Sequence, residues 1–287
     1  MIVRLLNYWT ALQRALARRY FEWFYNTPKE YTITYNDLVG NYKLVLRLSD
    51  GPGMRKRLRQ GTEMTERRLV EPLIQKGFVC VDVGAHVGDY LIEMAILTGT
   101  SGHVVGYEAI PHYYELTRAS IAANHLQNAE VKLAAVGATH EMIEVPTEML
   151  TGNLVKPGHI GTTGKTGTGK AKMQQVPVIA LDDNLAKIDY IKIDCEGYEL
   201  NVLRGAERLL SQGQPLIFLE VHNRQLKEIH GPEALEQLGR LLLEQHGFTL
   251  LQVSAKHCLC SKTTVTALAQ LPKIATVADF ARVFQKT

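Results

Sequence analysis

One stretch of the chain, residues 78–90, constrains the fold more than any other. It opens with the apolar, β-branched run Phe78–Val83, which is typical of a strand buried on both faces of a sheet. Gly84 and Gly88 interrupt this run, and apolar residues then resume at helical spacing. A strand that turns through glycines into a helix presents backbone N–H groups at the helix N-terminus, where a polar ligand group can bind. We therefore expect a ligand site at this turn, with Asp82 facing the same crevice.

The spacing of the glycines narrows the class of ligand. Dinucleotide-binding turns need G-x-G-x-x-G, with a glycine in the middle position where the backbone meets the pyrophosphate. His86 occupies that middle position here, so the fingerprint is absent. The pattern Asp-x-Gly-Ala-x-x-Gly over residues 82–88 instead resembles motif I of S-adenosylmethionine-dependent methyltransferases, in which the turn cradles the methionine half of the cofactor. An ordinary buried strand, turn and helix is the alternative interpretation of this stretch alone.

Composition sets broad limits on the class of protein. A chain of 287 residues can bury a full core, and a net charge of +3 is too small to indicate a nucleic-acid partner. No apolar run reaches the roughly 18 residues that a membrane span requires. The cysteines have neither metal nor disulfide spacing, so we expect buried thiols and a cytoplasmic location: Cys80, Cys195, Cys258 and Cys260.

The first 60 residues read as an extension of the main domain. An amphipathic helix is predicted over residues 1–25, and its basic face suits either peripheral contact with a membrane or packing against protein. Residues 31–35 and 42–48 alternate with period two and predict a β-hairpin. Residues 61–287 are then expected to form a single domain.

Strands and helices alternate through that domain without a linker. This order predicts a mostly parallel seven-stranded sheet with helices on both faces and a terminal antiparallel hairpin. Ligands bind such sheets outside the carboxyl ends of the strands. The strands are expected at residues 78–83, 102–108, 130–136, 188–194, 215–222, 248–253 and 263–268, with an extra hairpin near 142–149. Residues 164–170 resemble a phosphate-binding loop, but Ala171 replaces the required Ser or Thr, which predicts a surface loop.

Two further patterns point to chemistry. Glu108 ends the second strand, where one carboxylate can accept hydrogen bonds from both ribose hydroxyls of an adenosyl ligand. Tyr190, Lys192, Asp194 and Glu196 alternate with apolar residues and therefore share one face of a central strand. An internal ion pair between Lys192 and Asp194 would explain part of this pattern without excluding a role in a site.

From about residue 66 to residue 253 the chain closely resembles FkbM-type methyltransferases. The blocks that carry the resemblance are Asp82-Val-Gly-Ala-His-Val-Gly88, Tyr107-Glu108, Leu181-Asp-Asp183, Ile191-Lys-Ile-Asp-Cys-Glu-Gly-Tyr-Glu199 and Leu203-Arg-Gly-Ala206. The resemblance implies a class I methyltransferase fold and transfer of a methyl group from S-adenosylmethionine to a hydroxyl of a sugar, glycolipid or natural product. His86 stands where the family usually has Asn, and both residues tolerate unusual backbone angles.

The resemblance also implies roles for particular residues. Asp82, Gly84 and Glu108 are expected to contact the cofactor, with His86 and Gly88 in the same turn, whereas Asp194, Glu196 and Glu199 lie in the signature block. An alcohol is a poor nucleophile at neutral pH, so some group should take its proton.

Position along the strands suggests which group does so. Asp194 and His222 follow neighbouring strands, which suggests His222 as the general base, with Asp194 orienting the acceptor or the cofactor amine and Glu196 beside them. A divalent metal on Asp194, Glu196 and a further carboxylate stays open, although we assign none. A nucleotide-binding oxidoreductase and a non-catalytic scaffold are the competing functions.

Overall fold

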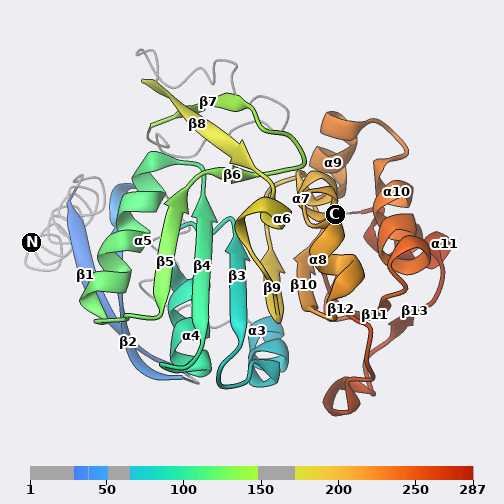
Figure 1. Ribbon diagram of the computed structural model, residues 1–287, viewed down its shortest axis with the longest axis horizontal. Helices are drawn as coiled ribbons and strands as arrows, with labels where there is room; N and C mark the ends of the chain where they lie inside the picture. Colours follow the sequence, from blue (N-terminus) through green and yellow to red (C-terminus); the bar gives the residue numbers. More distant parts are fainter. Residues whose placement is uncertain (1–28, 38, 51–64, 148–171, 287) are drawn as a thin grey trace, which may run out of the picture.

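The computed structural model describes residues 29–37, 39–50, 65–147 and 172–286. An eight-stranded sheet forms its centre, in the order β13-β11-β12-β10-β9-β3-β4-β5 (Figure 1). Five of these strands are parallel: β5 (Ala129–Leu133), β4 (His103–Glu108), β3 (Val79–Val83), β9 (Tyr190–Ile193) and β10 (Leu216–Glu220). The remaining three pair antiparallel: β12 (His257–Ser261), β11 (Thr249–Gln252) and β13 (Lys273–Ile274). This arrangement confirms the predicted α/β sheet and adds a two-residue edge strand.

The first strand of the domain, β3, lies at the switch point of the sheet. It pairs with β4 on one side and with β9 on the other, so the direction of winding reverses there. Asp82 of β3 is aligned with Lys192 of β9 and with Gly106 of β4. Ligands of open α/β sheets bind outside the carboxyl ends of the strands at this point.

Two expected strands differ from the structure. The partner of β11 is β12, whereas residues 266–268 form the short helix η4 (Thr266–Leu268), so the strand predicted over 263–268 is wrong. All five residues of β12 are buried between two neighbouring strands, and this burial outweighs the β propensity of the exposed threonines that follow. The strand predicted over 130–136 is also interrupted, because β6 (Ala135–Val136) leaves the main sheet to pair with β8 (Met173–Ile179).

Helices cover both faces of the sheet because the strand residues alternate between two cores. Cys80 and Tyr190 belong to one hydrophobic cluster, together with residues of α4 (Asp89–Thr98) and α5 (Pro111–Ala123). Val81 and Ile191 face a second cluster, which contains residues of α7 (Glu199–Arg204), α8 (Glu207–Gln212), α10 (Ala234–Arg240) and α11 (Val277–Phe284). The remaining helices are α3 (Thr65–Val70), α6 (Leu181–Asn184), α9 (Asn223–His230), η1 (Leu48–Asp50), η2 (Glu71–Leu73) and η3 (Leu241–Gln245).

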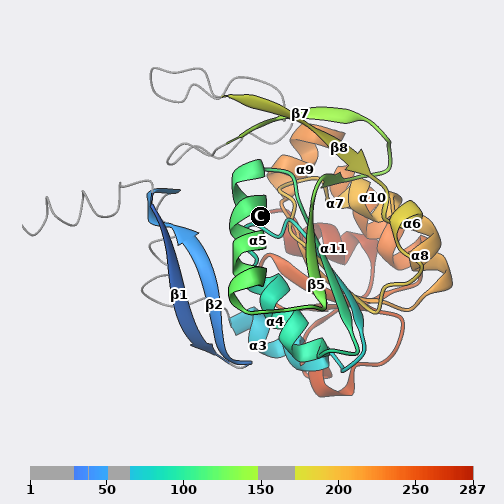
Figure 2. The same ribbon diagram turned by 60° about the vertical axis from the view of Figure 1, so that its left-hand side comes forward.

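The predicted amino-terminal hairpin is present as β1 (Glu30–Asp37) and β2 (Gly40–Arg47), and Figure 2 shows it beside α5. The Val45 N–H donates to Ser120 Oγ at 2.9 Å, and the Tyr42 hydroxyl donates to Glu93 at 2.5 Å. These buried contacts tie the hairpin to α4 and α5. The helix predicted over residues 1–25 lies outside the described residues, and the domain boundary near residue 60 stays a prediction.

A small second sheet lies above the carboxyl ends of the main strands (Figure 1). It consists of β6, β8 and β7 (Met142–Pro146), with β7 antiparallel to β8. The chain between β7 and β8 contains the phosphate-loop-like residues 164–170, which lie outside the described residues. In the part of the chain that the structure describes, no helix is both long enough and apolar enough to span a bilayer.

Candidate functional site

The turn after β3 depends on backbone angles that favour glycine. Gly84 and Gly88 have φ of 79° and 81°, and His86 between them has φ of 52°. A Cβ on Gly84 would fall 1.9 Å from the carbonyl oxygen of Asp194, so the turn and the end of β9 are in backbone contact. The positive φ of His86 agrees with the tolerance expected of a residue that replaces Asn.

The turn uses several of its own amides. The N–H groups of Gly84 and Ala85 donate to the carbonyl oxygen of Tyr107 at 3.0 and 3.1 Å, and the Gly88 N–H donates to Ala85 at 2.8 Å. These three amides therefore have partners within the protein: those of Gly84 and Ala85 hold the loop against the end of β4, and that of Gly88 closes the turn on itself. The expectation of N–H groups offered to a ligand at the start of the helix stays a prediction.

Glu108 closes the same turn from β4. Its carboxylate accepts the His86 N–H and the Ile110 N–H, both at 2.8 Å, and the residue is 7% exposed. Burial raises the pKa of Glu108 to about 6, although the two backbone hydrogen bonds lower it. An ionised carboxylate has about four acceptor positions, so two stay available for the hydroxyls of a ligand.

Asp82 lies beneath the turn, with no exposed surface. Its Oδ1 is 3.3 Å from Nζ of Lys192, which also donates to the carbonyl oxygen of Gly84 at 3.0 Å. Burial raises the pKa of Asp82, while the charge of Lys192 lowers it. The expectation that Asp82 faces the crevice is therefore wrong. Its carboxylate instead holds the lysine that fixes the turn.

Lys192 joins this turn to the next strand end. Its Nζ is 3.4 Å from Asp194 Oδ2, so the predicted ion pair is present, and Asp82 is a second partner that the alternation of residues did not indicate. Burial lowers the pKa of Lys192, but the charges of Asp82 and Asp194 outweigh it, so the pKa is raised and the ammonium stays charged.

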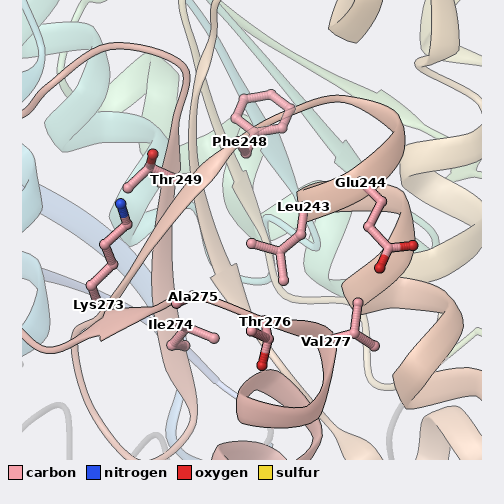
Figure 3. Close-up of a pocket in the computed structure, with 9 residues that line it drawn as sticks. All are labelled: Leu243, Glu244, Phe248, Thr249, Lys273, Ile274, Ala275, Thr276 and Val277. Atoms are coloured by element: carbon pink, nitrogen blue, oxygen red, sulfur yellow. The ribbon is translucent and has the colours of Figure 1, made fainter.

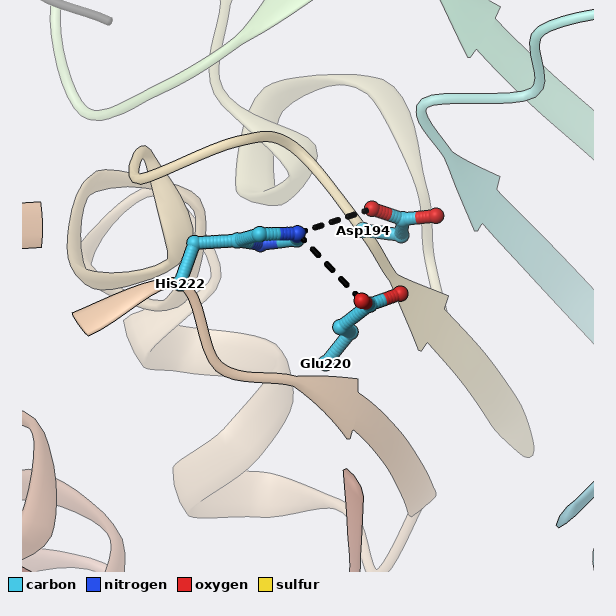
Figure 4. A group of neighbouring side chains, drawn as sticks. All are labelled: Asp194, Glu220 and His222. Atoms are coloured by element: carbon cyan, nitrogen blue, oxygen red, sulfur yellow. Dashed lines mark ion pairs between the residues drawn. The ribbon is translucent and has the colours of Figure 1, made fainter. Parts of the chain in front are cut away.

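His222 is surrounded by carboxylates at the end of β10 (Figure 4). Its Nδ1 is 2.9 Å from Glu199 Oε1, and its Nε2 is 3.4 Å from Glu220, 3.7 Å from Glu196 and 3.8 Å from Asp194. Burial lowers the pKa of His222, but the hydrogen bonds to Glu199 and Glu220 and the nearby charges outweigh it and raise the pKa to about 10. A protonated imidazole cannot accept a proton, so this arrangement argues against the general-base role that we expected for His222.

The predicted residues of the signature block differ in their access to solvent. The side chains of Asp194 and Glu196 are 34% and 53% exposed, and Glu196 has a positive φ of 52° in the turn after β9. Glu199 is fully buried. Its Oε1 accepts a hydrogen bond from the Gly197 N–H and also contacts His222 Nδ1. Asp194 and Glu196 are therefore the members of the block that can touch an acceptor.

Glu220 is a site residue that the sequence patterns did not lead us to expect. It precedes His222 by two positions, so the period of a strand places the two side chains on one face at the edge of the sheet. The sequence Glu-Val-His at the end of an apolar strand could have indicated this, because polar residues at alternate positions place both side chains on one face.

A separate hollow lies beside β11 and β13 (Figure 3). Its wall includes Phe248, Ile274 and Thr276, with Glu244 and Lys273 at its sides. None of the predicted site residues contributes to it. The predicted site residues lie instead at and after the carboxyl ends of β3, β4, β9 and β10.

Together, the sheet and the turn define the class I methyltransferase fold. The parallel sheet ends in an antiparallel pair, a glycine turn follows β3, and a carboxylate with free acceptor positions ends β4. The particular family follows from a family model, the methyltransferase FkbM domain, which matches residues 82–250, more than half of the chain. The chain belongs to the FkbM family of S-adenosylmethionine-dependent methyltransferases.

Several solved structures are similar to the chain. The methyltransferase FkbM from Methylobacillus flagellatus KT is 19% identical with a TM-score of 0.43, and the match covers 64% of this chain and 43% of that one. The O-methyltransferase from Bacillus cereus in complex with SAH is 16% identical with a TM-score of 0.43, covering 69% of this chain and 80% of that one. The precorrin-6y C5,15-methyltransferase from Geobacter metallireducens GS-15 is 17% identical with a TM-score of 0.38, and the match covers 68% of this chain and 85% of that one.

The chain thus spans less than half of the length of the Methylobacillus protein. A search among curated proteins found no match.

Proposed function

We propose that the chain is an O-methyltransferase that methylates a hydroxyl group of a small molecule, namely a sugar, a glycolipid or a natural product. The observation that carries this proposal is the backbone contact between Gly84 and Asp194, because it sets the cofactor turn directly beside a cluster of carboxylates. A methyl donor in the turn and a hydroxyl at the cluster would then be neighbours. Alignment of the two reactants accounts for much of the rate of such a reaction.

The cofactor side consists of the turn and Glu108. Glu108 is fixed by two backbone hydrogen bonds and keeps acceptor positions for the two ribose hydroxyls. Residues 84–88 follow β3 with a shape set by Gly84, Gly88 and Lys192. These features fit S-adenosylmethionine, which supplies an activated methyl group on a sulfonium when bound.

The acceptor side consists of Asp194 and Glu196. Both carboxylates are partly exposed, and both lie within 3.8 Å of the same imidazole nitrogen. S-adenosylmethionine held by the turn and Glu108 would supply the methyl group, and these two carboxylates would hold the acceptor hydroxyl beside it. Glu196, the more exposed carboxylate, takes the hydroxyl proton, and Asp194 orients the acceptor.

Labelled methyl transfer tests the proposal. The purified chain is incubated with methyl-labelled S-adenosylmethionine and with glycan and lipid fractions of a lysate, and each labelled product is analysed for the atom that carries the label. We expect label on a hydroxyl oxygen, reduced with Glu108→Ala at low cofactor concentration and retained with Asp183→Asn, a matched carboxylate in an exposed pair with His140. Label on nitrogen or carbon would contradict O-methylation. Cofactor binding without any labelled product would favour a scaffold.

A further inference from the structure

Three side chains from the ends of β9 and β10 converge on one point of the acceptor side. Asp194, Glu220 and His222 each offer one ligand atom, and these atoms all lie within 4.8 Å of one another. Figure 4 shows the imidazole directed at the two carboxylates. A histidine nitrogen with two carboxylate oxygens is a set of donors that metalloproteins use for divalent ions.

The histidine is held in the orientation that a metal ligand needs. Its side chain is 8% exposed, and Nδ1 is fixed at 2.9 Å from Glu199, which has no exposed surface. Nε2 is therefore the nitrogen that faces the cluster, and a bound cation would take the place of the proton that Nε2 carries in the ion-free protein. A carboxylate that holds the far nitrogen of a ligating histidine is the usual outer partner in metal sites, because it fixes the tautomer and the ring orientation.

Each carboxylate is divided between two tasks. Asp194 uses Oδ2 for the ion pair with Lys192 and directs Oδ1 toward His222 Nε2. Glu220 places Oε2 at 3.3 Å from His257 Nε2 and directs Oε1 toward the same nitrogen of His222. Outer partners thus hold all three ligand residues, and one atom of each is directed to a common centre.

The spacing of these atoms leaves room for an ion. The Nε2 separations of 3.4 Å and 3.8 Å exceed the roughly 2.7–2.9 Å of a charge-assisted hydrogen bond. If an ion lay about 2.2 Å from each atom, the angle at the ion between two such ligand atoms would be roughly 100–120°, which divalent metals accept. Glu196, with Oε2 at 3.7 Å from Nε2, adds further negative charge at the open side.

We infer that Asp194, Glu220 and His222 bind one divalent cation, and that the mixed nitrogen and oxygen set favours an ion of the Mn²⁺ type. Carboxylates suit Mg²⁺ and Mn²⁺, and imidazole suits later metals, so Mn²⁺ accepts both kinds of donor. The role of this ion in the reaction rests on the proposed function, whereas its binding does not. The partly exposed side of Asp194 leaves a position for the acceptor oxygen, and an ion there would acidify the hydroxyl that Glu196 deprotonates.

The test measures metal binding without methyl transfer. The full chain is treated with a chelator, dialysed and titrated with MnCl₂, and bound ion is followed by calorimetry and by the loss of the free Mn²⁺ signal in electron paramagnetic resonance. We expect one ion per chain. Asp194→Asn, Glu220→Gln and His222→Gln should each weaken Mn²⁺ binding by at least tenfold, and Glu199→Gln, which changes only the outer partner, by about 10- to 100-fold.

Two carboxylates paired with histidines elsewhere serve as matched controls. Asp183→Asn removes a partner of His140, and Glu207→Gln removes a partner of His246, so both should leave Mn²⁺ binding unchanged. SAH binding is measured on every variant. A variant that binds SAH but not Mn²⁺ is folded and supports the site.

Two results would overturn the inference. One is the absence of a saturable Mn²⁺ site in a chain that binds SAH, which would leave a protonated His222 as the cation of the cluster. The other is Mn²⁺ binding that survives Asp194→Asn and Glu220→Gln. Either result leaves the proposed O-methylation to its own labelled-transfer test, so the failure of one can be told from the failure of the other.

Discussion

The ammonium group of Lys192 lies 3.3 Å from the carboxylate of Asp82, within the sheet and beneath the glycine turn. Asp82 has no exposed surface, so this pair has been removed from water almost completely. A buried ion pair is a poor source of stability compared with apolar packing, but removal of one partner leaves an uncompensated charge. The pair is therefore best understood as a device that fixes the turn, since Lys192 also binds the carbonyl oxygen of Gly84.

Lys192→Met should destabilise the protein by about 3–5 kcal/mol, because the Asp82 carboxylate is left buried without its partner. The double variant Asp82→Asn with Lys192→Met should be destabilised by less than the sum of the two single changes, since the unpaired charge is gone. Urea unfolding measures both. Lys187→Met, which removes an exposed partner of Asp189, serves as the control and should cost less than about 1 kcal/mol. Equal effects for the two lysines would refute the role of burial.

Glu108→Ala should weaken binding of SAH by about 1–3 kcal/mol, roughly 5- to 150-fold. The change removes the acceptor for the ribose hydroxyls and also leaves the His86 N–H without its acceptor in the turn. Calorimetric titration with SAH measures the effect. Glu130→Ala, an exposed carboxylate on the neighbouring strand, should leave SAH affinity unchanged. Unaltered binding in Glu108→Ala would remove Glu108 from the cofactor site.

Binding of SAH should weaken as the pH falls through about 6, the raised pKa of Glu108. The ionised carboxylate is the form that accepts hydrogen bonds at both oxygens, so protons compete with the ligand below this pH and not above it. The dissociation constant should rise by at most about tenfold for each pH unit below 6. Glu108→Gln should bind more weakly and show a flat profile between about pH 5 and 7. A parallel slope in both proteins would assign the proton to another group.

Changes in the carboxylate cluster should act on transfer rather than on the cofactor. Glu196→Gln removes the proposed proton acceptor and should lower turnover by about 100- to 10,000-fold, with SAH affinity changed by less than about tenfold. Asp194→Asn and His222→Ala should also reduce turnover. Glu228→Gln, an exposed carboxylate of α9 paired with Arg224, is the control. If Glu196→Gln transfers methyl groups at the parent rate, another residue is the proton acceptor. If Asp194→Asn loses SAH binding, Asp194 belongs to the cofactor site.

A shortened chain that begins at Lys29 should bind SAH with the affinity of the full chain. The reason is that the described cofactor residues all belong to the α/β unit, from Asp82 onward. If residues 1–25 contact membranes, the full chain should sediment with anionic vesicles and the shortened chain should not. A shortened chain that folds, as judged by its thermal transition, but fails to bind SAH would contradict the prediction.

Local patterns were sufficient for the parts of the site that lie within one element. The turn of Gly84 and Gly88 and the strand-end position of Glu108 follow from residue order, because glycine φ angles and strand ends are set locally. The pairing of Lys192 with Asp194 follows from the two-residue period of a strand. The parallel arrangement of the central strands followed from the alternation of strand and helix, whereas their order in the sheet comes from the structure.

Features that depend on a neighbouring strand could not be predicted. Asp82 is aligned with Gly106 and so lies two residues below the level of Glu108, where Lys192 of the neighbouring strand β9 is its partner. Four carboxylates contact His222: those of Asp194 and Glu196 were expected nearby, whereas only the fold reveals that Glu199 and Glu220 meet it as well. The choice of β12 over residues 263–268 was likewise decided by burial between two strands.

The missing side chain at Gly84 has a consequence for attempts to alter the enzyme. Because a Cβ there would lie 1.9 Å from the backbone carbonyl oxygen of Asp194, position 84 cannot carry a side chain unless the end of β9 moves, whichever residue occupies position 194. A library that mutates Gly84 would therefore displace the end of β9 together with the turn, and its members would lose donor binding and acceptor placement at once. Side chains at the ends of β9 and β10 can be varied without this penalty, so they are the positions at which to begin when the acceptor is to be changed.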